Sequence, residues 1–180
     1  MRYYPIFLDV RGRRAVVVGG GKVAERKVRK LLRAGAGVSV ISPDLTPGLS
    51  RLAAANRIRV TRRVYRKGEL RRRRANSRSP ILVFAATNDP AAQRAVREDA
   101  RAGGALVDVA SDPAQCDFIV PASLTRGDLH AAISTSGTDP NLARLLRLLL
   151  QEVMREGKAH VLRKLARKIK NQKVKIKNEK

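Results

Sequence analysis

The order of apolar and polar positions along residues 1–112 predicts strands that alternate with helices. Short aliphatic runs, typical of buried parallel strands, are separated by stretches whose apolar residues share one helix face. The predicted strands are 15–19, 37–42, 57–65, 81–86 and 105–110, and the predicted helices are 25–34, 45–56 and 91–102. This order predicts an α/β fold built on a doubly wound parallel sheet.

The pattern changes after residue 112. Two short strands are predicted over 117–122 and 129–134, and a loop rich in Ser, Thr and Gly leads into a helix over 140–154. Pro140 stands near the first position of that helix, where proline is favoured. We therefore expect an α/β domain over 1–112, a small α+β region over 113–157 that ends in a helical segment, and a basic C-terminal tail over 158–180.

Three consecutive glycines follow the first predicted strand and lead into the first predicted helix. The spacing Gly19-x-Gly21-x-x-Ala24 matches the dinucleotide-binding fingerprint in its variant with Ala last. There the first glycine permits a tight turn, the second lets a pyrophosphate approach the backbone, and the small third residue packs the helix on the sheet. The alternative is a glycine turn kept only for packing. The surrounding strand-helix-strand unit favours a Rossmann-type domain with a nucleotide site.

Other candidate cofactor contacts follow the second and fourth predicted strands. Asp44 lies about 20 residues beyond the glycines, where such folds place an acidic residue near the adenosine ribose. A carboxylate there favours NAD over NADP. The alternative for Asp44 is an N-terminal cap of the helix predicted over 45–56. Thr87 and Asn88 end the fourth strand, so we expect them beside the cofactor, because ligands bind at the carboxyl ends of parallel strands.

Composition narrows the classes of partner and compartment. Aromatic residues make up 3% of the 180 residues and Trp is absent, so stacking platforms for single-stranded nucleic acid are not expected. The single cysteine, Cys116, excludes an internal disulfide and suits a reducing compartment. The sequence shows neither a signal peptide nor an apolar run of the ~18–20 residues that a membrane span needs. We expect a soluble cytoplasmic protein.

The charge is strongly positive, with 39 Lys and Arg against 15 Asp and Glu and a formal net charge of +24. A field of this size attracts polyanions or a small substrate with many carboxylates. Part of it lies in the C-terminal tail, and another part lies in a cluster at residues 71–74 with Arg78; solvated charge is the alternative for both. His130, His160 and Cys116 have no metal-ligand spacing, so no metal site is expected.

Three separated segments together resemble one known family. They are YPIFLDVRGRRAVVVGGGKVAERKVRKLLRAGAGVSVISP, FAATNDP and CDFIVPASLTRGDLHAAISTSGTDPNLARLLR, and they occur in that family's order over roughly residues 3–150. The family is that of the precorrin-2 dehydrogenases, some of which also act as sirohydrochlorin ferrochelatases. It includes the amino-terminal module of siroheme synthase. A generic Rossmann protein would share only the first segment.

The resemblance implies an enzyme of siroheme and tetrapyrrole biosynthesis that oxidises precorrin-2 to sirohydrochlorin and transfers a hydride to NAD⁺. It also implies a homodimer, in which the region over 113–157 supplies the subunit interface and part of the substrate cleft. Carried over by position, the cofactor contacts are Lys22, Val23, Pro43 and Asp44. The hydroxyl-rich loop with Ser134, Thr135 and Ser136 is implied to border the tetrapyrrole.

The basic charge has a cause under this resemblance. Precorrin-2 carries many carboxylates, so a positive cleft would raise its local concentration and association rate. Arg126 and Arg144 lie in the part that resembles the family and are candidate carboxylate contacts, since arginine suits bidentate pairing. The arginine cluster at 71–74 looks like an insertion relative to the family and is not assigned to the substrate.

One position departs from the family. Where members commonly have a catalytic Asp, in a stretch resembling N-V-V-D-D-P, this chain has Ser111. Oxidation of the macrocycle removes a proton as well as a hydride, and a carboxylate is a better base than a serine. Asp112 or Asp108 are the alternative bases, although Asp112 also suits an Asp-Pro turn. If the family Asp serves mainly metal insertion, this chain is a dehydrogenase with weakened or absent chelatase activity.

A second class of function competes with the enzyme. A Rossmann-type nucleotide-sensing module with a polyanion-binding tail would account for the basic residues over 158–180. It would not account for the segments CDFIVPA and STSGTDPNLARLL. The sequence also has neither a recognition-helix motif nor an RNA-binding signature.

Overall fold

The computed structural model describes residues 3–70 and 79–155 and divides the chain into two compact units. The first unit is Met1–Ile119 and the second is Val120–Lys180. The arginine cluster at 71–74, Arg78 and the basic tail with His160 lie outside the described residues.

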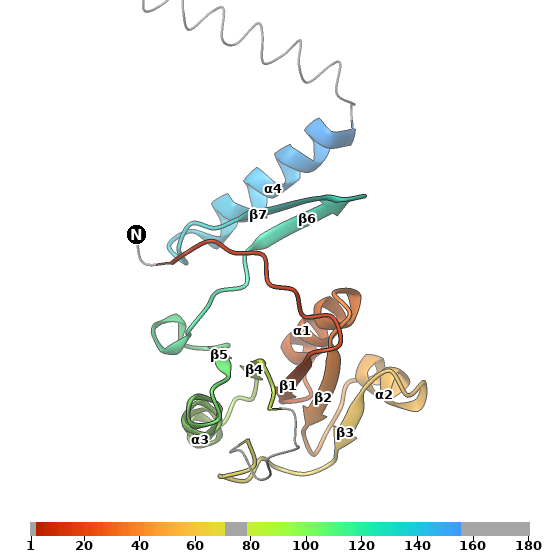
Figure 1. The fold of residues 1–180 in the computed structure, drawn as a ribbon, viewed down its shortest axis with the longest axis vertical. Coiled ribbons are helices and arrows are strands. Elements are labelled where there is room, and N and C mark those ends of the chain that lie inside the picture. Colours follow the sequence, from red (N-terminus) through yellow and green to blue (C-terminus); the bar gives the residue numbers. More distant parts are fainter. Residues whose placement is uncertain (1–2, 71–78, 156–180) are drawn as a thin grey trace, which may run out of the picture. The chain divides into compact units, whose positions relative to one another are not determined.

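Figure 1 shows the order of the elements along the chain. In the first unit they are β1 (Arg14–Val18), α1 (Lys22–Arg33), β2 (Gly37–Ile41), α2 (Pro47–Ala54), β3 (Arg59–Thr61), β4 (Leu82–Ala85), α3 (Pro90–Ala102), β5 (Leu106–Val109) and a short 3-10 turn η1 (Pro113–Gln115). In the second unit they are β6 (Ala122–Arg126), β7 (Leu129–Ile133) and α4 (Pro140–Arg155).

The first unit is built on a five-stranded parallel sheet. The strands lie in the order β3-β2-β1-β4-β5, so the chain adds β2 and β3 on one side of β1 and then crosses to add β4 and β5 on the other. The central strands read as continuous apolar runs because helices cover both faces of the sheet. The predicted doubly wound α/β fold is confirmed.

Two apolar clusters cover the two faces of this sheet. On one face, α1 and α2 pack through Ala24, Val28 and Leu49 against Val17 of β1 and its neighbours. On the other face, α3 packs through Val96 and Ala100 against alternate residues of β1, β4 and β5. The alternation follows from the strand period of two, which points successive side chains to opposite faces.

The segment after β3 leaves the sheet to contact α3. The Tyr65 hydroxyl donates to Oδ2 of Asp99 at 2.6 Å, and the Gly68 amide donates to the same carboxylate, which is fully buried. Burial, and then the bond to Asp99, raises the pKa of Tyr65. The strand predicted over 57–65 is therefore too long. Pairing with β2 ends at Thr61, because the chain turns away to satisfy a buried carboxylate.

The strand predicted over 117–122 is wrong in position. Asp117 accepts a hydrogen bond from the Val107 amide at 3.0 Å, and Phe118 packs edge-on against Phe84, with ring centroids 5.5 Å apart. Phe118 therefore packs against the core of the first unit, and the antiparallel hairpin starts only at Ala122.

The second unit consists of the β6–β7 hairpin and α4, which contacts both strands. The helix buries Ala143 but leaves a row of leucines exposed. None of the helices in the described ranges is long and apolar enough to cross a membrane.

Candidate functional site

The carboxyl edge of the parallel sheet gathers the loops that follow β1, β2, β4 and β5. The strand order reverses between β1 and β4, and open α/β sheets bind ligands at such a switch point. Ten of the predicted site residues lie in these loops or at the start of α1: Gly19, Gly21, Lys22, Val23, Pro43, Asp44, Thr87, Asn88, Ser111 and Asp112.

The glycine turn after β1 is held tightly at two of its three positions. Gly19 has φ +120°, and a Cβ there would lie 2.2 Å from the Ala86 carbonyl oxygen. A Cβ on Gly20 would lie 1.8 Å from the Asp44 carbonyl oxygen, and the Gly20 oxygen accepts from the Thr46 amide at 2.9 Å. Only glycine fits either place. The turn thus locks the loops after β2 and β4 against β1.

Gly21, unlike Gly19 and Gly20, has room for a side chain. A Cβ there would meet no heavy atom within 4 Å, so this glycine opens onto free space. It is the N-cap of α1, with extended backbone and no side-chain cap. The amides of the first helical turn have no partner within the helix and point toward an anion placed at its start. Lys22 and Val23 are exposed beside this space, and Ala24 is fully buried against the sheet.

These features fit the pyrophosphate of a dinucleotide. The open space at Gly21 is what a close approach of phosphate to backbone requires, and the uncapped helix start supplies donors and a positive dipole end. Glu25, the acidic residue of this first turn, is held away by its own partners. It accepts from Thr46 at 2.5 Å and from Arg29 at 2.6 Å, and these bonds, Thr46 first, lower the pKa of Glu25.

Pro43 and Asp44 lie exposed in the loop after β2. The capping alternative for Asp44 is wrong. The N-cap of α2 is Thr46, whose hydroxyl accepts from the Leu49 amide at 3.2 Å, and the helix begins at Pro47. Asp44 is left with its side chain in solvent and its carbonyl against the glycine turn.

The loop after β4 carries Thr87 and Asn88 to the same edge. Asp89 caps α3 by accepting from the Ala91 amide at 2.8 Å. The Thr87 carbonyl accepts from Nε2 of Gln93, in the first turns of α3, at 2.5 Å. Gln93 was not singled out from the sequence.

The loop after β5 holds the predicted catalytic residues. Ser111 is exposed, and its hydroxyl donates to Oε1 of Gln93 at 2.8 Å. Asp112 is the N-cap of η1. Its Oδ1 accepts from the Ala114 amide at 2.9 Å, and its Oδ2 accepts from Nε2 of Gln115 at 2.6 Å. The Asp-Pro turn expected as an alternative for Asp112 is therefore present.

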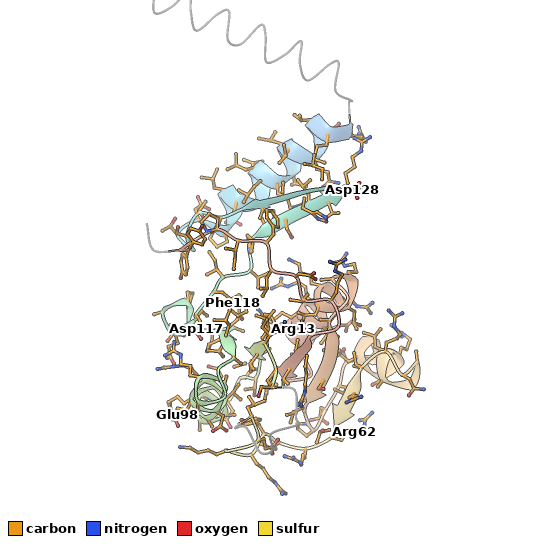
Figure 2. The ribbon with its side chains drawn as sticks, in the orientation of Figure 1. Arg13, Arg62, Glu98, Asp117, Phe118 and Asp128 are labelled. Carbon is orange, nitrogen blue, oxygen red and sulfur yellow. The ribbon has the colours of Figure 1, made fainter. Side chains whose placement is uncertain are left out.

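Asp108 is engaged in a buried ion pair. Nζ of Lys27, from α1, lies 2.7 Å from its Oδ1, with the two side chains 12% and 9% exposed, and 4.9 Å from the centroid of the Phe84 ring. Phe84 in turn contacts Phe118, labelled in Figure 2. In register, Asp108 stands opposite Phe84 in the row below the last row of the sheet, so the pair lies beneath the candidate site. Eighty-one residues separate the partners in sequence, so local periodicity carries no signal for it.

The remaining predicted residues belong to the second unit. Arg126 and Arg144 are exposed, and within residues 3–70 and 79–155 neither has an ion-pair partner. The hydroxyl-rich loop bonds largely to itself. Thr135 Oγ1 donates to the Asp139 carbonyl at 2.8 Å, and Ser134 Oγ accepts from the Ser136 amide at 3.0 Å. Ser136 sits at the loop's apex with φ +57°.

Asp139 already occupies the start of α4. Its Oδ1 accepts from the Leu142 amide at 2.8 Å. A carboxylate there uses the favourable end of the helix dipole, so this helix start is a poorer anion site than that of α1. Across the described residues, no group of three or more His, Cys, Asp and Glu side chains could hold a metal ion.

Comparison with known proteins agrees with this geometry. Residues 6–122 match a family described as "Putative NAD(P)-binding". The chain is 41% identical over 154 residues to a siroheme synthase of Methylobacillus flagellatus, covering 86% of this chain and 32% of that protein. It is 42% identical over 154 residues to a siroheme synthase of Nitrosococcus oceani, covering 86% of this chain and 31% of that protein. The chain thus spans about a third of these curated relatives.

One solved structure is similar to this chain over most of the length of both. "SirC, precorrin-2 dehydrogenase" superposes with a TM-score of 0.70 at 30% sequence identity, covering 83% of this chain and 70% of that one. Most of the architecture therefore has a counterpart in a solved protein, and the first unit lies within the NAD(P)-binding match. The chain belongs to the precorrin-2 dehydrogenase family and carries its NAD-binding domain.

Proposed function

We propose that this protein oxidises precorrin-2 to sirohydrochlorin with NAD⁺ as the hydride acceptor. The observation that supports this most is the glycine turn, where Gly21 opens onto free space at the uncapped start of α1, in a chain of the precorrin-2 dehydrogenase family. Because the chain spans about a third of the siroheme synthases that it matches, the proposal covers the dehydrogenase step and not the whole synthase.

The chain's own residues account for cofactor binding. When bound, NAD⁺ supplies the nicotinamide ring that takes up a hydride. Gly21 gives the pyrophosphate access to the backbone, and the first-turn amides of α1, those of Lys22 and Val23 included, donate to it. Pro43 and Asp44 border the adenosine ribose. There the exposed Asp44 carboxylate accepts from ribose hydroxyls and repels a 2′-phosphate, which favours NAD over NADP.

Proton removal is assigned to the loop after β5. Asp108 does not serve as the base, because its carboxylate is buried and paired with Lys27. Asp112 is half-buried, and each of its oxygens accepts one described bond and keeps a further lone pair. We assign Asp112 as the proton acceptor and Ser111, at the family's Asp position, as a neighbouring contact of the macrocycle.

The substrate's carboxylates are assigned to the second unit. Arg126 and Arg144 have exposed guanidinium groups that suit bidentate pairing. Ser134 and Thr135 are engaged within their own loop, so they shape it, and Ser136 at the apex is the hydroxyl assigned to the tetrapyrrole.

The second unit also favours a homodimer. Leu142, Leu145, Leu146 and Leu149 form one face of α4, and Leu145 and Leu149 are 53% and 56% exposed. An apolar face of this kind marks an interaction surface, and a second copy would bury it against the same face. We place the enzyme in the cytoplasm, because its lone free thiol, Cys116, suits a reducing compartment.

The test is anaerobic turnover of precorrin-2 with NAD⁺, following NADH and sirohydrochlorin together. The informative variant is Gly21→Val, whose side chain enters the free space where the pyrophosphate is expected. It should keep stability to within about 1 kcal/mol, since only an N-cap glycine is changed, yet lose NAD⁺ binding and turnover.

The matched control is Gly37→Ala. A Cβ there meets only the Arg13 carbonyl oxygen, at 3.8 Å, which is an ordinary contact. It should bind NAD⁺ as the wild type does. If Gly21→Val binds NAD⁺ normally, the cofactor does not lie at the glycine turn. If the wild type binds NAD⁺ but forms no NADH with precorrin-2, the nucleotide-sensing alternative becomes the better account.

A further inference from the structure

Gln93 joins two loops of the candidate site with one side chain. It lies in the first turns of α3, and its Nε2 is 2.5 Å from the carbonyl oxygen of Thr87, in the loop after β4. Its Oε1 is 2.8 Å from Oγ of Ser111, in the loop after β5. Thr87 is a predicted cofactor contact and Ser111 stands at the position of the family's catalytic Asp. The amide therefore bridges the cofactor and substrate sides of the site.

The direction of both hydrogen bonds follows from the chemistry of the groups. A backbone carbonyl can only accept, so the amide nitrogen of Gln93 must face Thr87. The amide oxygen then faces Ser111, and that oxygen can only accept, so the serine hydroxyl must donate. Ser111 has a single hydroxyl hydrogen, and it is donated in the hydrogen bond to Gln93. What Ser111 presents to any other group is a pair of acceptor lone pairs.

The bridge is also tied to the glycine turn. The Ala86 carbonyl, one residue before Thr87, lies against Gly19 so closely that a Cβ there would be 2.2 Å from its oxygen. The loop after β4 is therefore fixed by the glycine turn on one side and by Gln93 on the other. Through Gln93 the same constraint reaches Ser111.

The two carboxylates near Ser111 are Asp108, within β5, and Asp112, in the loop after β5, and each has partners of its own. Asp108 is paired with Lys27, and both oxygens of Asp112 accept hydrogen bonds from the turn that follows. Ser111 is exposed and has no described bond besides the one to Gln93. A tetrapyrrole presents ring N–H donors, for which an acceptor of fixed direction is the matching partner.

We infer that Gln93 is a positioning residue for the dehydrogenation, which fixes Ser111 Oγ as a hydrogen-bond acceptor toward the macrocycle and holds the Thr87 loop beside the cofactor. The inference rests on the proposed function. On this inference Ser111, which stands where the family commonly has Asp, orients an N–H group of the macrocycle. Proton removal is left to Asp112.

The first test is a double-mutant cycle of Gln93→Ala, Ser111→Ala and the double variant. Loss of an orienting contact should lower kcat at saturating NAD⁺ by about tenfold to a hundredfold, with little change in KM for precorrin-2. Because Gln93 acts through Ser111, Gln93→Ala should lower kcat much less when Ser111 is already Ala. The matched control is Glu98→Gln, on the same helix and labelled in Figure 2. Its carboxylate pairs with Lys67, and both side chains are more than half exposed. This variant should leave kcat unchanged.

The second test gives a pH signature that a purely structural role would not produce. The carboxylate of Gln93→Glu accepts from Ser111 but cannot donate to the Thr87 carbonyl. Protonation restores the donor, so kcat of Gln93→Glu should rise relative to wild type as the pH falls through the titration of that carboxyl. Gln93→Ala should show no such recovery. Additive effects in the cycle, or a constant ratio across pH for Gln93→Glu, would overturn the inference.

A third readout does not depend on turnover. Since Gln93 holds the Thr87 loop at the cofactor edge, Gln93→Ala should raise the NAD⁺ dissociation constant about two- to tenfold, measured by titration calorimetry. If the wild-type chain forms no NADH with precorrin-2, the proposed function fails, and these affinities still decide whether Gln93 orders the site. Equal NAD⁺ affinities for wild type and Gln93→Ala would then overturn the inference.

Discussion

The two units differ in how far their helices bury their apolar side chains. In the first unit, Val17 and Val83 are fully buried between helices on the two faces of the sheet. In the second unit, α4 buries Ala143 against its hairpin and leaves the larger Leu145 and Leu149 more than half exposed. The first unit completes its core with its own chain. The second has an apolar surface that a single described chain does not cover.

The difference separates the chemistry of the two units. A nucleotide site needs loops held at fixed positions, and the core of the first unit holds them, down to two glycines that accept no side chain. The second unit carries the arginines and the hydroxyl loop assigned to the substrate. Since its apolar helix face is proposed to lie against a second copy, we expect cofactor binding to survive dilution and substrate binding to depend on assembly.

The largest effect is expected at the buried ion pair of the first unit. Lys27→Met leaves the Asp108 carboxylate buried without its partner, which should lower the free energy of unfolding by about 3–5 kcal/mol in urea denaturation. Replacing both residues, as Lys27→Met with Asp108→Leu, should recover most of the loss. The control is Lys67→Met, whose pair with Glu98 is 63% and 54% exposed and should contribute about 1 kcal/mol or less. A loss no larger than this control would show that the pair is solvated.

Two leucine substitutions, one in each unit, test whether the first unit buries its own core and the second relies on a partner copy. Leu49→Ala removes a fully buried side chain from the first core and should cost about 2–5 kcal/mol at any protein concentration. Leu145→Ala, at an exposed position, should change the stability of a dilute monomer by no more than about 0.5 kcal/mol. Its effect should grow with protein concentration if the face is a dimer interface, and sedimentation should show weaker association. A concentration-independent effect of Leu145→Ala contradicts the homodimer.

Most of the first unit could be predicted because its signals are local. The strand, glycine turn and helix over residues 15–34 are each marked by residue type, and Gly35, with φ +80°, ends the helix as expected. The errors occur where distant residues decide. The alternating pattern up to Tyr65 indicates a long strand, yet Asp99, far along the chain, draws that residue out of the sheet.

The sequence predicts which loops form the candidate site, but not which side chains contact one another there. The position of Thr87 follows from the rule that ligands bind at the carboxyl ends of strands, whereas Ser111 is identified only through the family resemblance. The residue that connects them, Gln93, lies in a helix whose pattern indicates only a core face. Its role depends on the distance between two loops, which the sequence does not encode locally. The ion pair of Lys27 and Asp108 was missed for the same reason.

A smaller effect is expected where the loop after β2 meets α1. Thr46→Val removes both the cap of α2 and the donor to Glu25, and the lost cap should cost about 1 kcal/mol at neutral pH. The cap does not titrate, but the bond from the Thr46 hydroxyl to Glu25 does, and it is the first cause that holds the pKa of Glu25 below its ordinary value. The contribution of that bond is present above the ordinary pKa and is lost as the pH falls through the folded-state pKa. The difference from wild type should therefore shrink in acid. Ser50→Ala, within the same helix, is the control, and its difference from wild type should stay constant with pH.

The smallest effect concerns reactivity and leaves stability unchanged. Cys116 lies between β5 and the end of the first unit, where its Sγ accepts from the Val109 amide at 3.1 Å, and burial raises the pKa of its thiol. Only the thiolate reacts with iodoacetamide, so at neutral pH the folded chain should be alkylated at least about tenfold more slowly than the chain in urea. The chain has one cysteine, so mass spectrometry reads the rate directly. If the segment before the second unit instead opens freely, folded and unfolded chains should react alike, and the first unit would not be closed by its own chain at this end.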